Sequence, residues 1–321
     1  SKTYDGTATT DPTQYTVSLS QQLTAPTWTA DDFDLSGITS QNVGSYEVKL
    51  SAKGLVDLQA ANPNYKLTSA DVTSGHLVIT PATITVTAPT ISKVYDGQAY
   101  TGNASLTLTG VPTAGEQPSF TMTDISDAKN AGTYRLTALN GQNLDNYTVN
   151  VIDGALTITP APIQITAPTL KKEYDGSPYA DSVTPVIAGL PSQGVAPVYS
   201  MTALGDDTNA GIYTIAVNTP ADENPNYAIS TTAGQLTITP MTPQFRFVVD
   251  AIYQTLGQQS GTITTDTGVK INQPKWTPDD FVRVDMGNGT YTVTLSEQGL
   301  KALQDANPNL AISSADITPS Q

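Results

Sequence analysis

The chain repeats itself about every 80 residues, and this period constrains its fold more than any other feature. Three copies carry the phrase Lys-x-Tyr-Asp-Gly near their start and close on Leu-x-Ile-Thr-Pro. The closing prolines are Pro81, Pro160 and Pro240. Solenoid repeats are only about 20 to 45 residues long, so units of this length are expected to be separate small domains in tandem.

The array is expected to hold four modules of two subtypes. The predicted boundaries of modules 1 to 4 are residues 1–81, 82–160, 161–240 and 241–321. Modules 1 and 4 (subtype A) share the phrase Trp-Thr-x-Asp-Asp-Phe, which modules 2 and 3 (subtype B) lack. Module 1 has no counterpart of the strand expected at 84–88, and module 4 stops before a closing strand. We therefore expect both ends to be fragment boundaries.

Short runs rich in Thr, Val, Ile and Tyr, separated by Gly, Pro and Asn, predict a mainly β chain. The closing prolines leave linkers of one or two residues, which predicts an elongated rod. In the outer modules, the leucine spacing predicts short helices at 55–62 and 300–307. A β-grasp-like sheet crossed by a helix and an immunoglobulin-like sandwich are both compatible with these elements.

The composition excludes several classes of site. The chain has no cysteine and one histidine, which excludes disulfides, cysteine-based zinc sites and histidine-based triads. That histidine, His76, precedes an expected strand and is interpreted as a surface residue. The formal net charge of −15 argues against nucleic acid and anionic membranes, because both are bound by clustered Lys and Arg. No apolar run is long enough for membrane insertion. We expect a soluble monomer.

The Tyr-Asp-Gly tripeptide predicts a structural turn with a buried tyrosine, because Gly accepts positive φ and Tyr buries its ring well. The three turns are Tyr4-Asp5-Gly6, Tyr95-Asp96-Gly97 and Tyr174-Asp175-Gly176.

A lysine before each of these turns recurs together with an asparagine that begins the phrase Asn-x-Gly-x-Tyr. The candidate pairs are Lys2 and Asn42, Lys93 and Asn130, and Lys172 and Asn209. Module 4 lacks both residues, with Ile252 or Tyr253 near the lysine position and Gly287 at the asparagine position. One interpretation is an intramolecular isopeptide bond, which needs a buried acid nearby. The other is a solvated lysine and a turn asparagine.

Adjacent aspartates and exposed aromatic residues are the remaining candidates. The aspartate pairs are Asp31-Asp32, Asp206-Asp207 and Asp279-Asp280. Capping or solvation is the favoured interpretation, calcium is the alternative, and no stretch matches the EF-hand loop. The candidates for stacking on sugars are Tyr100, Tyr179, Trp28 and Trp276. The two tryptophans recur at matched positions, as core anchors also would.

Lysine before Tyr-Asp-Gly, Asn-Ala-Gly-x-Tyr, Asn-Pro-Asn-Tyr or Asp-Asn-Tyr, and a closing Leu-Thr-Ile-Thr-Pro-Ala together resemble the MBG and YDG repeats of Gram-positive surface proteins, common in lactobacilli. Modules 2 and 3 resemble them best. The resemblance implies a secreted, cell-wall-anchored, non-catalytic adhesin region that acts as a stalk or spacer, with mucin or other host glycans as its ligands. The alternative is an accessory array on a large secreted enzyme that acts on glycans.

Overall fold

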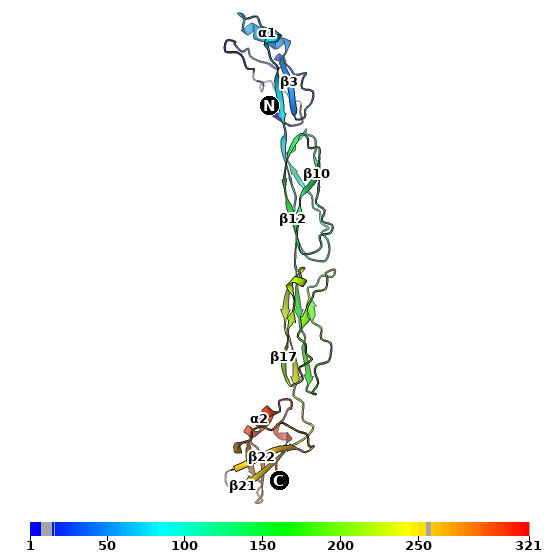
Figure 1. Ribbon diagram of the computed structural model, residues 1–321, viewed down its shortest axis with the longest axis vertical. Coiled ribbons are helices and arrows are strands. Elements are labelled where there is room, and N and C mark those ends of the chain that lie inside the picture. Colours follow the sequence, from blue (N-terminus) through cyan, green and yellow to red (C-terminus); the bar gives the residue numbers. More distant parts are fainter. Residues whose placement is uncertain (8–14, 16, 255–257, 321) are drawn as a thin grey trace. The chain divides into compact units, whose positions relative to one another are not determined.

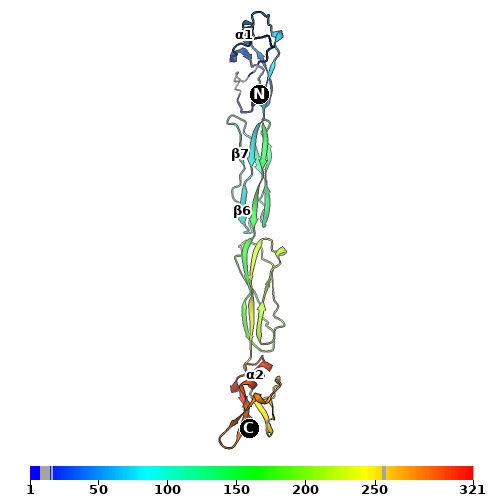
Figure 2. The ribbon, with the colours of Figure 1, turned by 90° about the vertical axis from the view of Figure 1, so that its left-hand side faces the viewer.

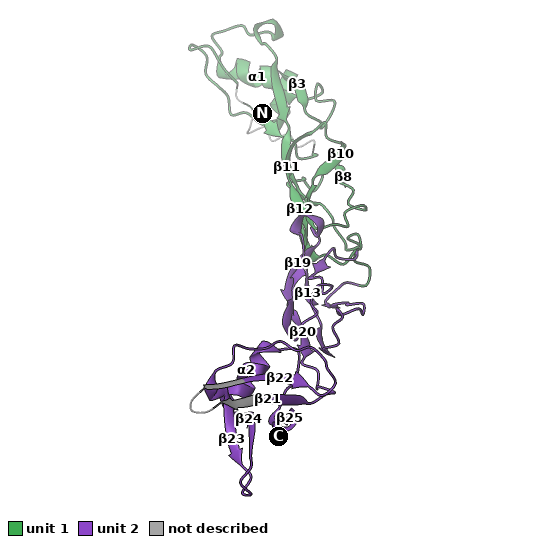
Figure 3. Ribbon diagram, turned by 60° about the horizontal axis from the view of Figure 1, so that its bottom comes forward, with its two compact units in different colours: residues 1–160, 192–194 green, residues 161–191, 195–321 purple. Residues whose placement is uncertain are grey.

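The computed structural model describes residues 1–7, 15, 17–254 and 258–320. It divides the chain into two compact units (Figure 3). Unit 1 comprises residues 1–160 and 192–194, and unit 2 comprises residues 161–191 and 195–321. The described residues are mainly β and include two α-helices, α1 (Ala52–Ala61) and α2 (Glu297–Ala306). A mainly β chain with a short helix in each outer module is therefore confirmed.

Module 1 contains a four-stranded mixed sheet in the order β1-β4-β3-β2. The strands are β1 (Lys2–Thr3), β2 (Phe33–Asp34), β3 (Gly44–Leu50) and β4 (Gly75–Thr80). The first strand, β1, runs parallel to the last, β4. Helix α1 follows β3 and lies beside it (Figure 1). It begins three residues before the predicted start, because the Ser51 hydroxyl caps it by accepting from the Gly54 N–H at 3.1 Å.

Module 2 consists of three small sheets without a helix. Strand β5 (Ala82–Thr87) lies between β11 (Tyr147–Ile152), which is parallel to it, and β7 (Thr107–Thr109). Strand β12 (Gly154–Thr159) lies between β6 (Thr90–Val94) and β9 (Gly132–Leu136). The third sheet pairs β8 (Ser119–Met122) with β10 (Ala138–Gln142). Figure 2 shows β7 and β6 at successive levels of the module.

Module 3 repeats the strand pairing of module 2. Its first sheet holds β13 (Ala161–Thr166) between β15 (Val186–Ala188) and β19 (Tyr227–Thr232). Its second holds β20 (Gly234–Thr239) between β14 (Thr169–Glu173) and β17 (Gly211–Ile215), and its third pairs β16 (Ser200–Met201) with β18 (Val217–Asn218). Ala161 pairs with Tyr227 just as Ala82 pairs with Tyr147, so the two modules share one register.

Module 4 resembles module 1 in having a helix after a sheet strand. Strand β21 (Phe247–Gln254) lies between β22 (Gln258–Thr265), which is antiparallel to it, and β25 (Ile317–Thr318), which is parallel to it. A hairpin of β23 (Phe281–Asp285) and β24 (Tyr291–Leu295) leads into α2. Short 3-10 helices precede β2, β4, β19, β23 and β25: η2 (Ala30–Asp32), η3 (Ser69–Asp71), η4 (Ala221–Glu223), η5 (Pro278–Asp280) and η6 (Ser314–Asp316).

The cores follow from the alternation of the strands. In module 2, Ile84 and Val86 point inward from β5 and are fully buried, whereas the alternating threonines Thr83, Thr85 and Thr87 are not. The burial of each such side chain contributes about 1.5–3 kcal/mol, so the first strand of a module supplies a large share of its core. In module 4, Phe247 and Val249 on β21 hold the same inward positions and are 0% and 1% exposed.

Candidate functional site

Each Tyr-Asp-Gly turn is closed by its own lysine. In module 2, the Lys93 ammonium lies 2.7 Å from the Asp96 carboxylate, and the same carboxylate accepts the Gln98 N–H at 2.9 Å. The hydrogen bond from Lys93 lowers the pKa of Asp96. The equivalent ion pairs join Lys2 to Asp5 and Lys172 to Asp175 at 2.9 and 2.8 Å. The glycines adopt positive φ, at 72°, 79° and 76° for Gly6, Gly97 and Gly176.

The tyrosine of the first turn packs into the next module. Tyr4 is 4% exposed, and its ring meets Tyr147 of module 2 edge-on with the centroids 5.4 Å apart. Its hydroxyl accepts the Glu116 N–H at 3.0 Å, and the Tyr147 hydroxyl donates to the Glu116 carbonyl at 2.5 Å. The first Tyr-Asp-Gly turn therefore lies at the boundary between modules 1 and 2, although it stands at the start of the sequence of module 1.

An asparagine amide completes the boundary within unit 1. The Asn146 side chain, which is 2% exposed, accepts the Val43 N–H at 2.8 Å through its Oδ1. Its Nδ2 donates to Oδ1 of Asn42 at 3.1 Å, and its backbone carbonyl accepts the Ala82 N–H. One residue of module 2 thus binds the Asn-x-Gly phrase of module 1 and the incoming first strand at once.

The same contacts recur in unit 2 between modules 3 and 4. Oδ1 of Asn309 accepts the Ala210 N–H at 2.6 Å, and its Nδ2 donates to Oδ1 of Asn209 at 3.0 Å. The Asn309 carbonyl accepts the Met241 N–H at 2.9 Å. We call this arrangement the asparagine clamp. In each case it joins the trailing end of one module to the leading end of the next.

A second asparagine, two positions earlier in the Asn-Pro-Asn phrase, works inside its own module. The buried Asn62 amide accepts the Thr24 N–H at 2.7 Å and donates to the Thr24 carbonyl at 2.8 Å. Asn224 and Asn307 make the same two-point contact with Val198 and Asn272. Module 2 has Leu144 at this place. The phrase is evident in the sequence, but nothing there indicates the role of either asparagine.

The candidate Lys–Asn pairs are engaged with other groups. Lys2 binds Asp5 and the Thr7 carbonyl, whereas the Asn42 side chain binds Asn146. Lys172 likewise binds Asp175, and the Asn209 side chain binds Asn309. Lys93 binds Asp96, and Asn130 lies in the turn before β9, where its carbonyl accepts the Tyr134 hydroxyl. The isopeptide interpretation stays a prediction.

The second aspartate of each outer pair is buried and caps a 3-10 helix. Asp32 accepts the N–H and hydroxyl of Thr29 and binds the Lys53 ammonium at 2.6 Å. Asp280 accepts the same two groups from Thr277, but its further partner is the neutral amide of Gln298 at 3.1 Å. Asp206 and Asp207 are in a turn. Among the described residues, no three acidic or histidine side chains are placed to hold a metal ion.

The aromatic candidates lie in separate modules. Trp28 and Trp276 are half-buried and pack on Phe33 and Phe281, with ring centroids 5.9 and 5.3 Å apart. Tyr179 is half-buried against the core that contains Leu204, and Tyr100 is half-buried at the equivalent place in module 2. His76 is exposed on β4. In the part of the chain that the structure describes, no helix meets the length and hydropathy of a membrane span.

Family models match most of the chain. The MBG domain model matches residues 1–81 and 250–320, and the YDG domain model matches residues 80–154. A search of the curated proteins found no match. Neither model covers residues 161–240, although the strands there pair in the register of module 2. The matched motifs and the repeated strand pairing lead to one assignment: residues 1–81 and 250–320 are MBG-type and residues 80–154 are YDG-type repeat domains.

Proposed function

We propose that this chain is a non-catalytic spacer region of an extracellular surface protein, in which modules 1 and 2, and likewise modules 3 and 4, hold each other in a fixed orientation. The asparagine clamp carries this proposal. The same two side-chain hydrogen bonds join Asn42 and Val43 to Asn146 in unit 1, and Asn209 and Ala210 to Asn309 in unit 2. A spacer needs module ends that recognise one another, and the repeated polar residues are used for that purpose.

The family supports the same role. MBG and YDG domains are repeat domains associated with surface adhesins, and two of the three matched segments are of the MBG type. Secretion and attachment to a cell wall are part of the proposal on this basis. The other recurring polar residues support turns: Lys93 and Asp96 bind each other within one turn rather than facing a shared cavity.

Mucin and other host glycans are the ligand class proposed for any direct binding. The aromatic rings that a sugar would stack on are half-buried in four different modules, and the two tryptophans pack on their own cores. An exposed aromatic groove repeated along the array would favour a lectin. The packing of Trp28 on Phe33 and of Trp276 on Phe281 instead favours the spacer.

Surface-plasmon binding to immobilised mucin separates the two roles. The chain is passed over mucin before and after enzymatic removal of the glycans, with and without EDTA. A spacer gives no glycan-dependent signal at high protein concentration. Glycan-dependent binding that disappears in the Tyr100→Ala and Tyr179→Ala double variant would show that the chain acts as a lectin and would contradict the spacer proposal. Loss of such binding in EDTA would add calcium as its cofactor.

A further inference from the structure

The first and last strands of module 2 are paired in parallel through both of its three-stranded sheets. Strand β5 pairs with β11, and β6 pairs with β12. The partner of each paired residue lies 65 positions further along the chain, from Ala82 with Tyr147 to Val94 with Thr159. One register therefore runs from one sheet into the other. We call this pairing of β5 and β6 with β11 and β12 the terminal ladder.

Hydrogen bonds continue the terminal ladder across the break between the two sheets. The Ala88 N–H donates to the Ile152 carbonyl at 2.9 Å, and the Ala155 N–H donates to the Pro89 carbonyl at 3.1 Å. Gly154 lies at the same level, and a Cβ there would come within 2.0 Å of the Pro89 carbonyl oxygen. The two strands approach each other this closely because the position has no side chain.

Module 3 has a terminal ladder of the same kind. Strands β13 and β14 pair in parallel with β19 and β20, at a constant separation of 66 positions from Ala161 with Tyr227 to Glu173 with Thr239. The close approach recurs at Gly234, where a Cβ would lie 2.0 Å from a proline carbonyl oxygen. The ladder is therefore a feature that both modules keep, although the segment between its strands differs in length by one residue.

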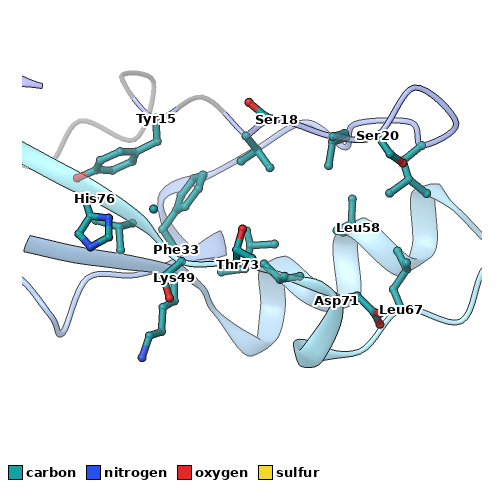
Figure 4. Close-up of a pocket in the computed structure, with 18 of the residues that line it drawn as sticks. Tyr15, Ser18, Ser20, Phe33, Lys49, Leu58, Leu67, Asp71, Thr73 and His76 are labelled. Atoms are coloured by element: carbon teal, nitrogen blue, oxygen red, sulfur yellow. The ribbon is translucent and has the colours of Figure 1, made fainter.

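The terminal ladder of module 2 is buried on its inner face. Val86, Leu156 and Ile158 point inward from its strands and are at most 1% exposed. These apolar side chains keep water from that face, and a lower local dielectric strengthens hydrogen bonds. The cavity of about 490 Å³ in unit 1 is lined by residues of module 1, among them Phe33 and Leu58 (Figure 4), and by none of the ladder strands.

We propose that modules 2 and 3 each resist tension applied along the chain, and that the terminal ladder is the part that resists it. The chain enters module 2 at Ala82 and leaves it at Thr159. Because the strands are parallel, these two points lie at opposite ends of the ladder, about 40 Å apart at a rise of about 3.3 Å per residue. Tension then pulls the strands lengthwise past each other, and the evenly spaced hydrogen bonds of a parallel ladder bear the force together.

The segment between the ladder strands is outside the path of this force. Residues 95–146, which contain β7 to β10, connect the inner ends of the ladder. Equilibrium stability depends on the whole module, whereas forced unfolding is governed by the unfolding rate, and therefore by the contacts that break first. The inference concerns each of the two modules by itself. It does not depend on the spacer proposal, and it holds equally for an array that binds glycans.

Single-molecule force spectroscopy of the full chain, pulled in two directions, tests the proposal. The chain has no cysteine, so two introduced cysteines, kept reduced until handles are attached, define the points at which force is applied. Thr83→Cys with Thr159→Cys pulls the ladder lengthwise. Thr83→Cys with Thr148→Cys pulls on two residues that are paired at one end of the ladder, and so peels the strands apart. All three threonines are exposed.

We expect the lengthwise pair to unfold module 2 at a force about threefold higher or more at the same pulling speed, because peeling breaks the hydrogen bonds of the ladder in turn. Equal forces in the two directions would overturn the proposal.

Two glycine variants of the lengthwise-pulled chain distinguish the ladder from the rest of module 2. Gly154→Ala places a Cβ against the Pro89 carbonyl oxygen within the ladder. Gly141→Ala is the matched control, since its Cβ would lie 2.5 Å from the Leu144 side chain and 2.8 Å from the Phe120 ring, outside the ladder. Both variants are expected to lower the unfolding temperature.

Under constant tension, Gly154→Ala is expected to shorten the lifetime of module 2 by about tenfold or more, the usual scale of an overpacking loss. Gly141→Ala is expected to change that lifetime by no more than about twofold, because the contacts it disturbs break after the ladder. Lifetimes shortened equally by the two variants would overturn the proposal. If Gly154→Ala does not fold, the comparison of the two pulling directions decides.

Discussion

The side chains of Asn146 and Asn42 are hydrogen-bonded although 104 positions separate them in the chain, with Nδ2 of Asn146 donating to Oδ1 of Asn42 at 3.1 Å. The other half of the Asn146 amide accepts the Val43 N–H. A side-chain amide is suited to this place because it offers one donor and one acceptor in a fixed plane. The contact therefore sets the orientation of module 2 on module 1 as well as holding the two together.

Asn146→Ala is expected to destabilise unit 1 by about 1–3 kcal/mol, because it removes a buried side chain and leaves the half-buried Val43 N–H without its acceptor. Chemical denaturation, followed by circular dichroism, measures the loss. The matched control is Asn64→Ala, which removes the equivalent but exposed side chain of module 1 and is expected to change stability by no more than about 0.5 kcal/mol. Equal losses for the two variants would show that the clamp adds nothing to stability.

The variants Gly6→Ala and Gly176→Ala distinguish the free-energy cost of a positive φ from the cost of a steric collision at a module boundary. Both glycines have positive φ, which costs about 1–2 kcal/mol for a residue with a side chain. A Cβ at Gly6 would also collide with the Ala114 carbonyl of module 2, whereas the nearest atom to a Cβ at Gly176 is the Tyr174 hydroxyl at 3.8 Å.

We therefore expect Gly6→Ala to cost about 1–3 kcal/mol more than Gly176→Ala, the usual range for overpacking. Differential scanning calorimetry of the two variants provides the comparison. If the two variants lower the unfolding temperature equally, the loop around Ala114 does not pack against the first Tyr-Asp-Gly turn.

Lys53→Gln is expected to change how unit 1 responds to acid. The hydrogen bond from the Lys53 ammonium, together with the N–H and hydroxyl of Thr29, holds the pKa of the buried Asp32 well below its usual range. A carboxylate whose pKa is lower in the folded state stabilises the fold above the unfolded pKa, about 3.9, and this contribution is lost as the pH falls through the folded pKa. Glutamine is the residue that module 4 uses opposite Asp280.

The variant is therefore less stable than the parent at pH 7, and the difference shrinks as the pH falls below about 4. Urea denaturation at pH 7, 4 and 3 follows this convergence. Asp57→Asn is the control, since Asp57 also binds Lys53 but is on the surface. A difference that stays constant from pH 7 to pH 3 would mean that the Lys53–Asp32 pair does not control the acid response.

Intact-mass measurement decides the chemistry of the recurring lysine and asparagine residues. Each isopeptide bond would remove one ammonia from the mass of the chain. Because Lys2 binds Asp5 and Asn42 binds Asn146, we expect the unmodified mass. A deficit of one, two or three ammonia molecules would contradict these contacts, and Lys93→Met with Lys172→Met would then identify the linked modules.

The sequence was most informative where structure is local. Alternation predicted the strands, and leucine spacing before Asn-Pro predicted the helices to within three residues of their observed starts. The Ser51 cap explains that difference, since a serine before Ala-Lys-Gly was a helix signal that the leucine pattern did not include. The resemblance to MBG and YDG repeats was confirmed for modules 1, 2 and 4, whereas neither model covers module 3, which we expected to be one of the two best matches.

The clamp could not be predicted, because its two halves lie in different modules. Asn42 and Asn146 each recur in a recognisable phrase, but nothing in either phrase shows which backbone N–H the other will meet. Recurrence of Asn42 with Lys2 suggested a partnership between those two residues. The structure instead gives Asn42 the amide of Asn146, and Lys2 the carboxylate of Asp5. The module boundaries, the rod shape and the glycan ligands stay predictions.

Small-angle X-ray scattering of the purified chain tests the spacer most directly. Strands β5 and β6 follow one another over residues 82–94 of module 2, and at about 3.3 Å per residue this stretch makes a module about 40 Å long. Four modules joined end to end should give a radius of gyration above roughly 40 Å, whereas a compact chain of this length gives about 20 Å. The account predicts the larger value, with little change at higher salt. A value near 20 Å would contradict it.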